Sequence, residues 1–123
     1  MKKIFFLFLF SVVSVVSVFA FEELNMDNFE SKIKDKNVIV DFYAPWCPPC
    51  KIIASSLDSY AANKPKNIEI YKVNVDDELS LAKKYGVSKL PTVIYFKNGK
   101  AVKDYVGVLS PEEFEKASKE NFK

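Results

Sequence analysis

The segment from Asn37 to Cys50 constrains the fold more than any other part of the chain. It begins with NVIVDFY (37–43), an apolar and β-branched run typical of a strand that is buried on both faces of a sheet. Three prolines follow within residues 44–50, and proline cannot continue a central strand. From Pro49 onward, apolar residues recur at helical spacing, and a helix tolerates proline in its first turn. The segment therefore predicts a buried strand, a sharp turn and a helix.

The pattern of the other residues predicts an α/β fold. Asp27 and Glu30 stand in capping-box register, and so do Ser110 and Glu113. Asn98-Gly99 is a strong hairpin signal, because both turn positions favour positive φ. The predicted elements are helices at Asp27–Lys34, Glu78–Tyr85 and from Pro111 to about Asn121, and strands at Ile68–Val75, Thr92–Lys97 and Lys100–Val106. Their order predicts a mixed four- to five-stranded sheet with helices on both faces.

The first twenty residues have the pattern of a secretory signal. Met1-Lys2-Lys3 gives a charged start, an apolar run follows, and Ala20 is a small residue that suits cleavage. The run Ile4–Ala20 also leaves open an uncleaved membrane anchor. We therefore expect a signal peptide at 1–20 and one domain at 21–123. The expected location is extracytoplasmic, foremost the bacterial periplasm or cell envelope, with a secreted protein or the ER lumen as alternatives.

Composition excludes several classes of function. The chain has no histidine, which rules out Ser-His-Asp and Cys-His catalysis and every histidine-ligated metal site. Without Lys2 and Lys3, the 18 basic residues fall to 16 and balance the 16 acidic ones. A neutral domain without arginine offers little footprint for nucleic acid. No later apolar run approaches the ~20 residues of a membrane span, so we expect a domain that does not span a membrane, and a monomer by default.

Cys47-Pro48-Pro49-Cys50 lies where the buried strand gives way to the helix. The spacing brings both sulfurs within bonding range, and the helix N-terminus stabilises a thiolate on Cys47. Cys47 is therefore expected to attack in thiol–disulfide exchange, and the more shielded Cys50 to resolve the mixed disulfide. A residue before proline avoids helical angles, which predicts extended backbone at Cys47 and Pro48.

The two cysteines have three alternative interpretations. A structural disulfide across so short a loop would remove little chain entropy. A metal site would need ligands from elsewhere, so we expect no metal. Haem attachment requires a histidine where Lys51 stands. Redox chemistry is the prediction that fits the position best.

The run Val40–Lys51, VDFYAPWCPPCK, resembles the active-site segment of the thioredoxin family. The resemblance covers about Asn25 to Phe122 and continues through Tyr85-Gly86-Val87, Leu90-Pro91-Thr92, Phe96-Lys97-Asn98-Gly99 and Val106-Gly107. It implies a three-layer sandwich and a protein-disulfide reductase that transfers electrons through a redox-active Cys47–Cys50 disulfide and needs no other cofactor.

The resemblance also implies roles for individual residues. Asp41 matches the family's buried aspartate, a proton acceptor for Cys50, and burial of a carboxylate raises its pKa; the alternative is a core aspartate hydrogen-bonded for structure. Lys72 matches the lysine that partners this aspartate, or it is a partly exposed strand lysine. Pro91 matches the family's cis-proline. The residues implied in substrate binding are Trp46, Pro48, Pro49, Leu90, Pro91 and Gly107.

These features together predict a reductase of disulfides in exported proteins, re-reduced by a membrane-embedded thiol donor. Pro48 stands where the family commonly has glycine, and this departure leaves the direction of electron flow open. The alternatives are therefore a disulfide oxidase or isomerase that uses the same cysteines, or a non-enzymatic binding module with the same fold.

Overall fold

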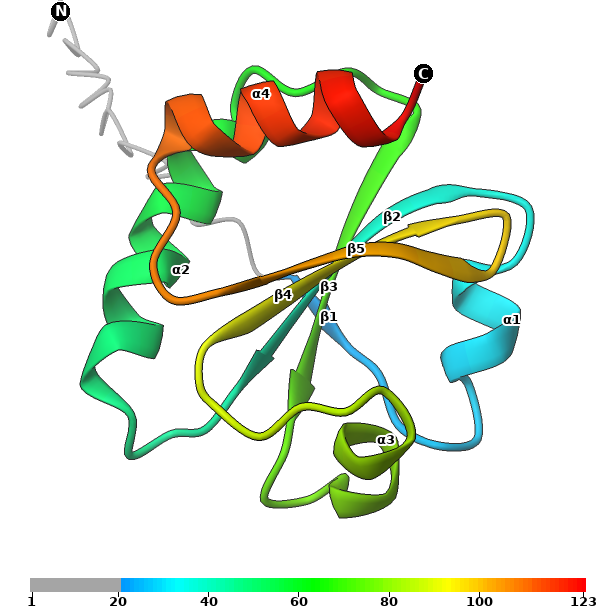
Figure 1. Cartoon of the computed structure of the whole chain (residues 1–123), viewed down its shortest axis with the longest axis vertical. Coiled ribbons are helices and arrows are strands. Elements are labelled where there is room, and N and C mark those ends of the chain that lie inside the picture. Colours follow the sequence, from blue (N-terminus) through cyan, green and yellow to red (C-terminus); the bar gives the residue numbers. More distant parts are fainter. Residues whose placement is uncertain (1–20) are drawn as a thin grey trace, which may run out of the picture.

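In the described part of the chain, five strands form one mixed sheet in the order β1-β3-β2-β4-β5 (Figure 1). The computed structural model describes residues 21–123, so the signal or anchor predicted at 1–20 lies outside the described residues. The strands β1, β2 and β3 run parallel, and β4 and β5 add an antiparallel hairpin next to β2. The strand bounds are β1 Glu22–Glu23, β2 Asn37–Tyr43, β3 Ile68–Asn74, β4 Thr92–Lys97 and β5 Lys100–Val106.

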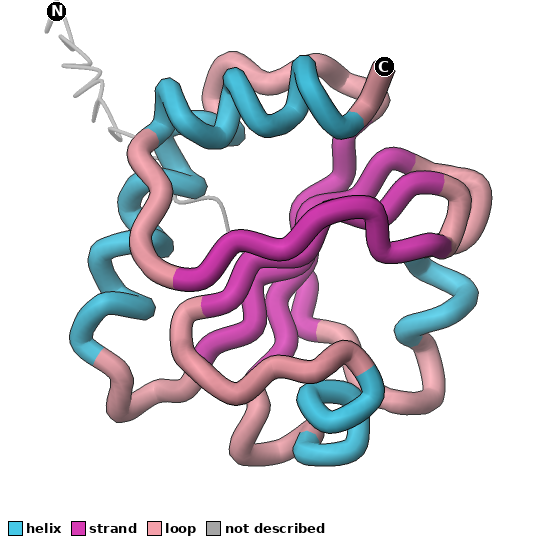
Figure 2. The backbone as a smooth tube through the Cα atoms, viewed as in Figure 1, coloured by secondary structure: helices cyan, strands magenta, loops and turns pink. Residues whose placement is uncertain are grey.

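Within residues 21–123, four helices cover the two faces of this sheet (Figures 1 and 2). Their bounds are α1 Phe29–Ile33, α2 Pro48–Ala61, α3 Leu79–Lys84 and α4 Pro111–Asn121. The buried residues of α1 and α3 belong to one apolar cluster, and those of α2 and α4 to a second, apart from Cys50 at the start of α2. The prediction of a mixed sheet between two helical layers is confirmed.

Strand β2 is the centre of the sheet and carries the site toward one edge of it. Both neighbours pair along most of its length, and its five inner residues are buried. Because side chains alternate along a strand, Val40 packs with α1 and α3, whereas Ile39 packs with α2 and α4. Asp41 follows Ile39 on the α2 side. The strand therefore buries a carboxyl group beneath the helix that begins with the cysteines.

Two expectations for the N-terminal part were wrong. Helix α1 begins at Phe29 rather than Asp27, and its N-cap Asn28 makes no side-chain capping bond. The Asn25 side chain instead accepts hydrogen bonds from the backbone N–H groups of Asp27 and Asn28. This asparagine turn takes the place of the predicted capping box of Asp27 and Glu30, because the Asp27 N–H that would have donated to Glu30 already donates to Asn25.

The predictions made from local sequence signals further along the chain are confirmed. Asn98 and Gly99 have φ of 53° and 80°, as the predicted hairpin requires. Ser110 and Glu113 form the predicted capping box at the start of α4. The predicted bounds of β2, β4 and β5 are those observed. No helix formed by residues 21–123 has the length and apolar character to cross a membrane.

A buried hydroxyl cluster joins α2, β4 and α4. Tyr60 Oη and Ser118 Oγ lie 2.7 Å apart, and Tyr95 Oη donates to the carbonyl of Phe114 at 3.1 Å. Ser118→Ala leaves the buried Tyr60 hydroxyl without this partner, so we expect the free energy of unfolding to fall by about 1–3 kcal/mol in urea titrations. Ser55→Ala, at an exposed position of α2, should change it by less than ~0.5 kcal/mol. Equal losses in both variants would contradict a stabilising role for the cluster.

Candidate active site

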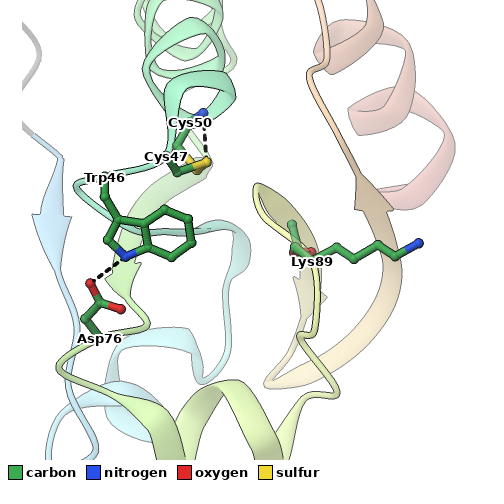
Figure 3. Close-up of a disulfide and its surroundings, with 6 residues drawn as sticks. Trp46, Cys47, Cys50, Asp76 and Lys89 are labelled. Carbon is green, nitrogen blue, oxygen red and sulfur yellow. Dashed lines mark hydrogen bonds between the residues drawn. A yellow bond between two sulfur atoms is a disulfide. The ribbon is translucent and has the colours of Figure 1, made fainter.

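Cys47 and Cys50 form a disulfide at the N-terminus of α2 (Figure 3). Their Cα atoms lie 5.3 Å apart, and Cys47 is the N-cap of the helix. The backbone N–H of Cys50 donates to Cys47 Sγ at 3.3 Å. An amide and the positive end of the helix dipole therefore both face Cys47 Sγ. Negative charge is stabilised there when the disulfide is reduced, as the attacking thiolate requires.

The backbone of the Cys47-Pro48 pair agrees with the prediction at Cys47 but not at Pro48. Cys47 is extended, with φ of −93° and ψ of 110°, as predicted for a residue before proline. Pro48, however, is the first residue of α2, so its predicted extended backbone was wrong. The helix begins one residue earlier because the first turn needs no proline N–H and suits the fixed proline φ. The disulfide is thus held across the first helical turn.

An apolar groove of about 410 Å³ opens beside the disulfide. The side chains of Cys47 and Cys50 are about equally buried, with exposed fractions of 4% and 5%. The exposed fractions therefore do not confirm the expectation that Cys50 is the more shielded cysteine. Position separates them instead, because Cys47 lines the groove and Cys50 does not. The lining residues are Trp46, Cys47, Pro48, Pro49, Val75, Leu79, Ala82, Val87, Ser88 and Leu90.

The structure brings four of the six expected substrate-binding residues into this groove. Trp46, Pro48, Pro49 and Leu90 line it, whereas Pro91 and Gly107 do not. The Leu90–Pro91 peptide bond is cis, as the resemblance implies. Pro91 is buried and its carbonyl accepts a hydrogen bond from the Gly107 N–H at 2.9 Å. These two residues therefore lie side by side at the end of the β4–β5 hairpin.

The sequence did not predict that α3 forms one wall of the groove. This wall includes Leu79 and Ala82, together with Val87 in the following loop. Leu79 is 61% exposed although it is a large apolar residue. A large apolar residue on the exposed face of a predicted short helix could have indicated a binding surface. Helical periodicity alone, however, does not show that this face lies next to the cysteines.

Trp46 lies on the surface and is oriented by a hydrogen bond. It is 69% exposed, so it is not a buried structural aromatic. The indole N–H donates to Asp76 Oδ2 at 3.0 Å, across 30 residues of sequence (Figure 3). The Lys89 side chain extends away from the disulfide in the same view. Asp76 therefore fixes an exposed ring at the mouth of the groove, a role that the sequence did not indicate.

Asp41 is a buried acid without a hydrogen-bond partner. It is 1% exposed, and neither carboxyl oxygen has a partner among residues 21–123. Burial raises the pKa of Asp41 from 3.8 to about 7, while the charge of Lys72 lowers this pKa. The alternative of an aspartate hydrogen-bonded for structure does not fit this environment. A carboxyl group with a pKa near neutrality can accept and release a proton under ordinary conditions.

Lys72 is next to Asp41 in the sheet but does not contact it as an ion pair. The two residues are register partners across β2 and β3. Among residues 21–123 the ion pairs within 4.0 Å do not include them. The Lys72 ammonium lies instead over the ring of Tyr43, 4.5 Å from the centroid. Lys72 therefore acts on Asp41 through its charge at a distance.

The described part of the chain offers no cluster of three or more acidic, cysteine or histidine side chains that could hold a metal ion. The reactive groups that the site does present are the two sulfurs and the carboxyl group of Asp41. A reversible disulfide at a helix N-terminus, with a proton acceptor below it and an open groove beside it, can exchange two electrons with another disulfide.

Comparisons with known proteins agree with this geometry. The family model described as Thioredoxin matches residues 20–120. The chain is 44% identical over 72 residues to the thioredoxin of Griffithsia pacifica, covering 58% of this chain and 66% of that protein, just under two thirds. It is 44% identical over 85 residues to the thioredoxin of Chlamydia caviae, covering 69% and 82%. The structure of Malassezia sympodialis thioredoxin superposes with a TM-score of 0.73 at 30% identity, covering 83% of this chain and 90% of that one.

Proposed function

Because the chain belongs to the thioredoxin family, we propose that it reduces disulfide bonds of exported proteins outside the cytoplasm. The observation that carries the redox part is the Cys47–Cys50 disulfide at the N-terminus of α2, with Cys47 on the groove. Thioredoxins act without a cofactor, and here the two cysteines supply the redox centre. Disulfide-containing proteins are the proposed partners.

The reaction follows from the positions of the two sulfurs. The Cys47 thiolate attacks one sulfur of a substrate disulfide, a mixed disulfide forms, and the other substrate sulfur leaves as a thiolate. Cys50 gives its proton to Asp41 and then attacks Cys47 Sγ, which releases the second substrate sulfur. The Cys47–Cys50 disulfide remains, and two electrons have passed to the substrate. A thiol donor embedded in the membrane is the proposed source of two electrons and two protons for the next cycle.

The reductase activity is tested with insulin as substrate and dithiothreitol as electron donor. We expect the wild-type chain to accelerate the release of the insulin chains well above the dithiothreitol background. A wild-type rate equal to that background would overturn the proposed activity.

The proposed location rests on residues 1–20, whose charged start and apolar run suit an export signal. Expression of the full chain in a bacterium, followed by fractionation and N-terminal sequencing, tests it. We expect an envelope protein that begins at Phe21. Protein that keeps Met1 in the membrane fraction would indicate the uncleaved anchor, and protein in the cytoplasm would overturn the location.

The alternative is an oxidase or isomerase that uses the same cysteines. Pro48 bears on this choice because it removes one N–H from the first turn of α2, beside the sulfur whose thiolate must be stabilised. A less stabilised thiolate favours the disulfide and makes the pair more reducing. Equilibration of the Cys47–Cys50 pair with glutathione separates the two directions, since ~30 mV corresponds to ~1.4 kcal/mol. We expect a potential more reducing than that of the glutathione pool. A strongly oxidising potential would replace the proposed reductase by the oxidase.

A further inference from the structure

We propose that Tyr43 is a positioning residue for the redox site: its ring holds the ammonium group of Lys72 near Asp41 and so favours the ionised carboxylate. The inference rests on the proposed function, in which Asp41 accepts the proton of Cys50. It concerns the contact between Tyr43 on β2 and Lys72 on β3, and neither cysteine takes part in this contact.

The sheet register brings the three side chains to one face. Asp41 and Tyr43 are two residues apart on β2, so they point to the same side. Lys72 on β3 is the register partner of Asp41 in a parallel pair, which puts its side chain on that side as well. The Lys72 ammonium lies 4.5 Å from the centroid of the Tyr43 ring, well inside the ~6 Å range of a cation–π interaction.

The ring is itself held in place. Tyr43 is half-buried and is the last residue of β2, where its ring also reaches the apolar cluster of α1 and α3 that includes both cysteines. A lysine side chain has four carbons and many rotamers, so an unrestrained ammonium group would spend much of its time in water, where its charge is screened. The contact with Tyr43 therefore keeps the positive charge at a defined place on the Asp41 side of the sheet.

Asp41 depends on this charge because no hydrogen bond from residues 21–123 offsets the burial of its carboxyl group. Three elements pack around it: β3 brings Lys72, β4 places Val93 opposite, and α2 brings Ile53 into the same apolar cluster as Val93. The charged side chains of α2 are the exposed Lys51 and the half-buried Asp58. Among the charged residues of 21–123, Lys72 is the one whose charge acts on Asp41, and it lowers the pKa of that carboxyl group.

A double-mutant cycle tests the proposal, with the pKa of Asp41 measured by ¹³C NMR of its carboxyl carbon. The oxidised protein is used because disulfide-bonded cysteines do not titrate. We expect Lys72→Gln to raise the pKa of Asp41 by about 1, and Tyr43→Leu to raise it by about 0.5. Tyr43→Phe keeps the ring and should leave this pKa unchanged. In the Lys72→Gln background, Tyr43→Leu should have no further effect.

The cycle separates positioning from a structural role. If Tyr43 only shields Asp41 from water, Tyr43→Leu changes the pKa equally with and without Lys72, and the proposal is overturned. No change, or a lower pKa, in the single variant overturns it as well. Circular dichroism checks folding, and Tyr43→Met replaces Tyr43→Leu if the latter unfolds. The insulin assay on the wild type is a separate measurement, so failure of the proposed function would be seen independently of the result of the cycle.

Discussion

Replacing Cys47 with serine is expected to lower the rate of insulin disulfide reduction by about 1,000-fold or more. The attacking group is a thiolate, which the N–H of Cys50 and the N-terminus of α2 stabilise on Cys47 Sγ. A serine hydroxyl does not ionise at neutral pH and is a far weaker nucleophile toward sulfur. Serine is also a good N-cap residue, so the variant should fold and the loss should be one of chemistry.

Cys50→Ser is the matched control for this experiment. It keeps Cys47 and should still attack the substrate, but no second thiol is present to release the mixed disulfide. The expected result is a covalent complex that is visible on a non-reducing gel and disappears with dithiothreitol. A complex formed by Cys47→Ser and not by Cys50→Ser would show that the two roles are reversed.

The second large effect concerns Asp41 and stability. Its pKa is about 7 in the folded protein against 3.8 for the free group, so the folded state keeps a proton that the unfolded chain releases. The free energy of unfolding should therefore fall as the pH rises from about 4 through about 7. The difference between the two pKa values corresponds to a loss of about 4 kcal/mol. Urea titrations of the oxidised protein at pH 4 and pH 8 measure it.

Asp41→Asn should remove most of this pH dependence, because the amide is neutral at both pH values. The variant is thus expected to gain stability relative to the wild type between pH 4 and pH 8 by about the same amount. Asp27→Asn, at an exposed position, serves as the control. Its free energy of unfolding should change with pH as steeply as that of the wild type. If the free energy of unfolding of Asp41→Asn still fell with pH as in the wild type, another group would be the cause of the pH dependence.

The elements that the sequence predicts best are those with local signals. Asn98-Gly99 allows few structures other than a hairpin, and Ser110 with Glu113 satisfies backbone amides within one helical turn. Strand β1 was missed because it has only two residues, both exposed glutamates, and so carries no periodicity. It forms because its backbone pairs with β3, and backbone pairing leaves no mark in the side chains.

The same distinction holds for the site. The position of the cysteines could be predicted from a CxxC motif after a buried strand, and Asp41 could be singled out by the resemblance to the thioredoxin family and by its place on that strand. The hydrogen bond of Trp46 to Asp76 and the contact of Lys72 with Tyr43 could not. Both depend on which rotamer a long or large side chain adopts between separate elements, and packing rather than residue order decides that.

The burial of the disulfide also bears on which molecules can reduce it. Exchange requires the incoming thiol to approach along the line of the two sulfurs, yet the exposed fractions of Cys47 and Cys50 are only 4% and 5%. A small thiol in free solution meets few productive orientations, whereas a protein that fits the groove is guided to Cys47. A donor that fits the groove is thus expected to reduce the disulfide faster, molecule for molecule, than a small thiol such as dithiothreitol.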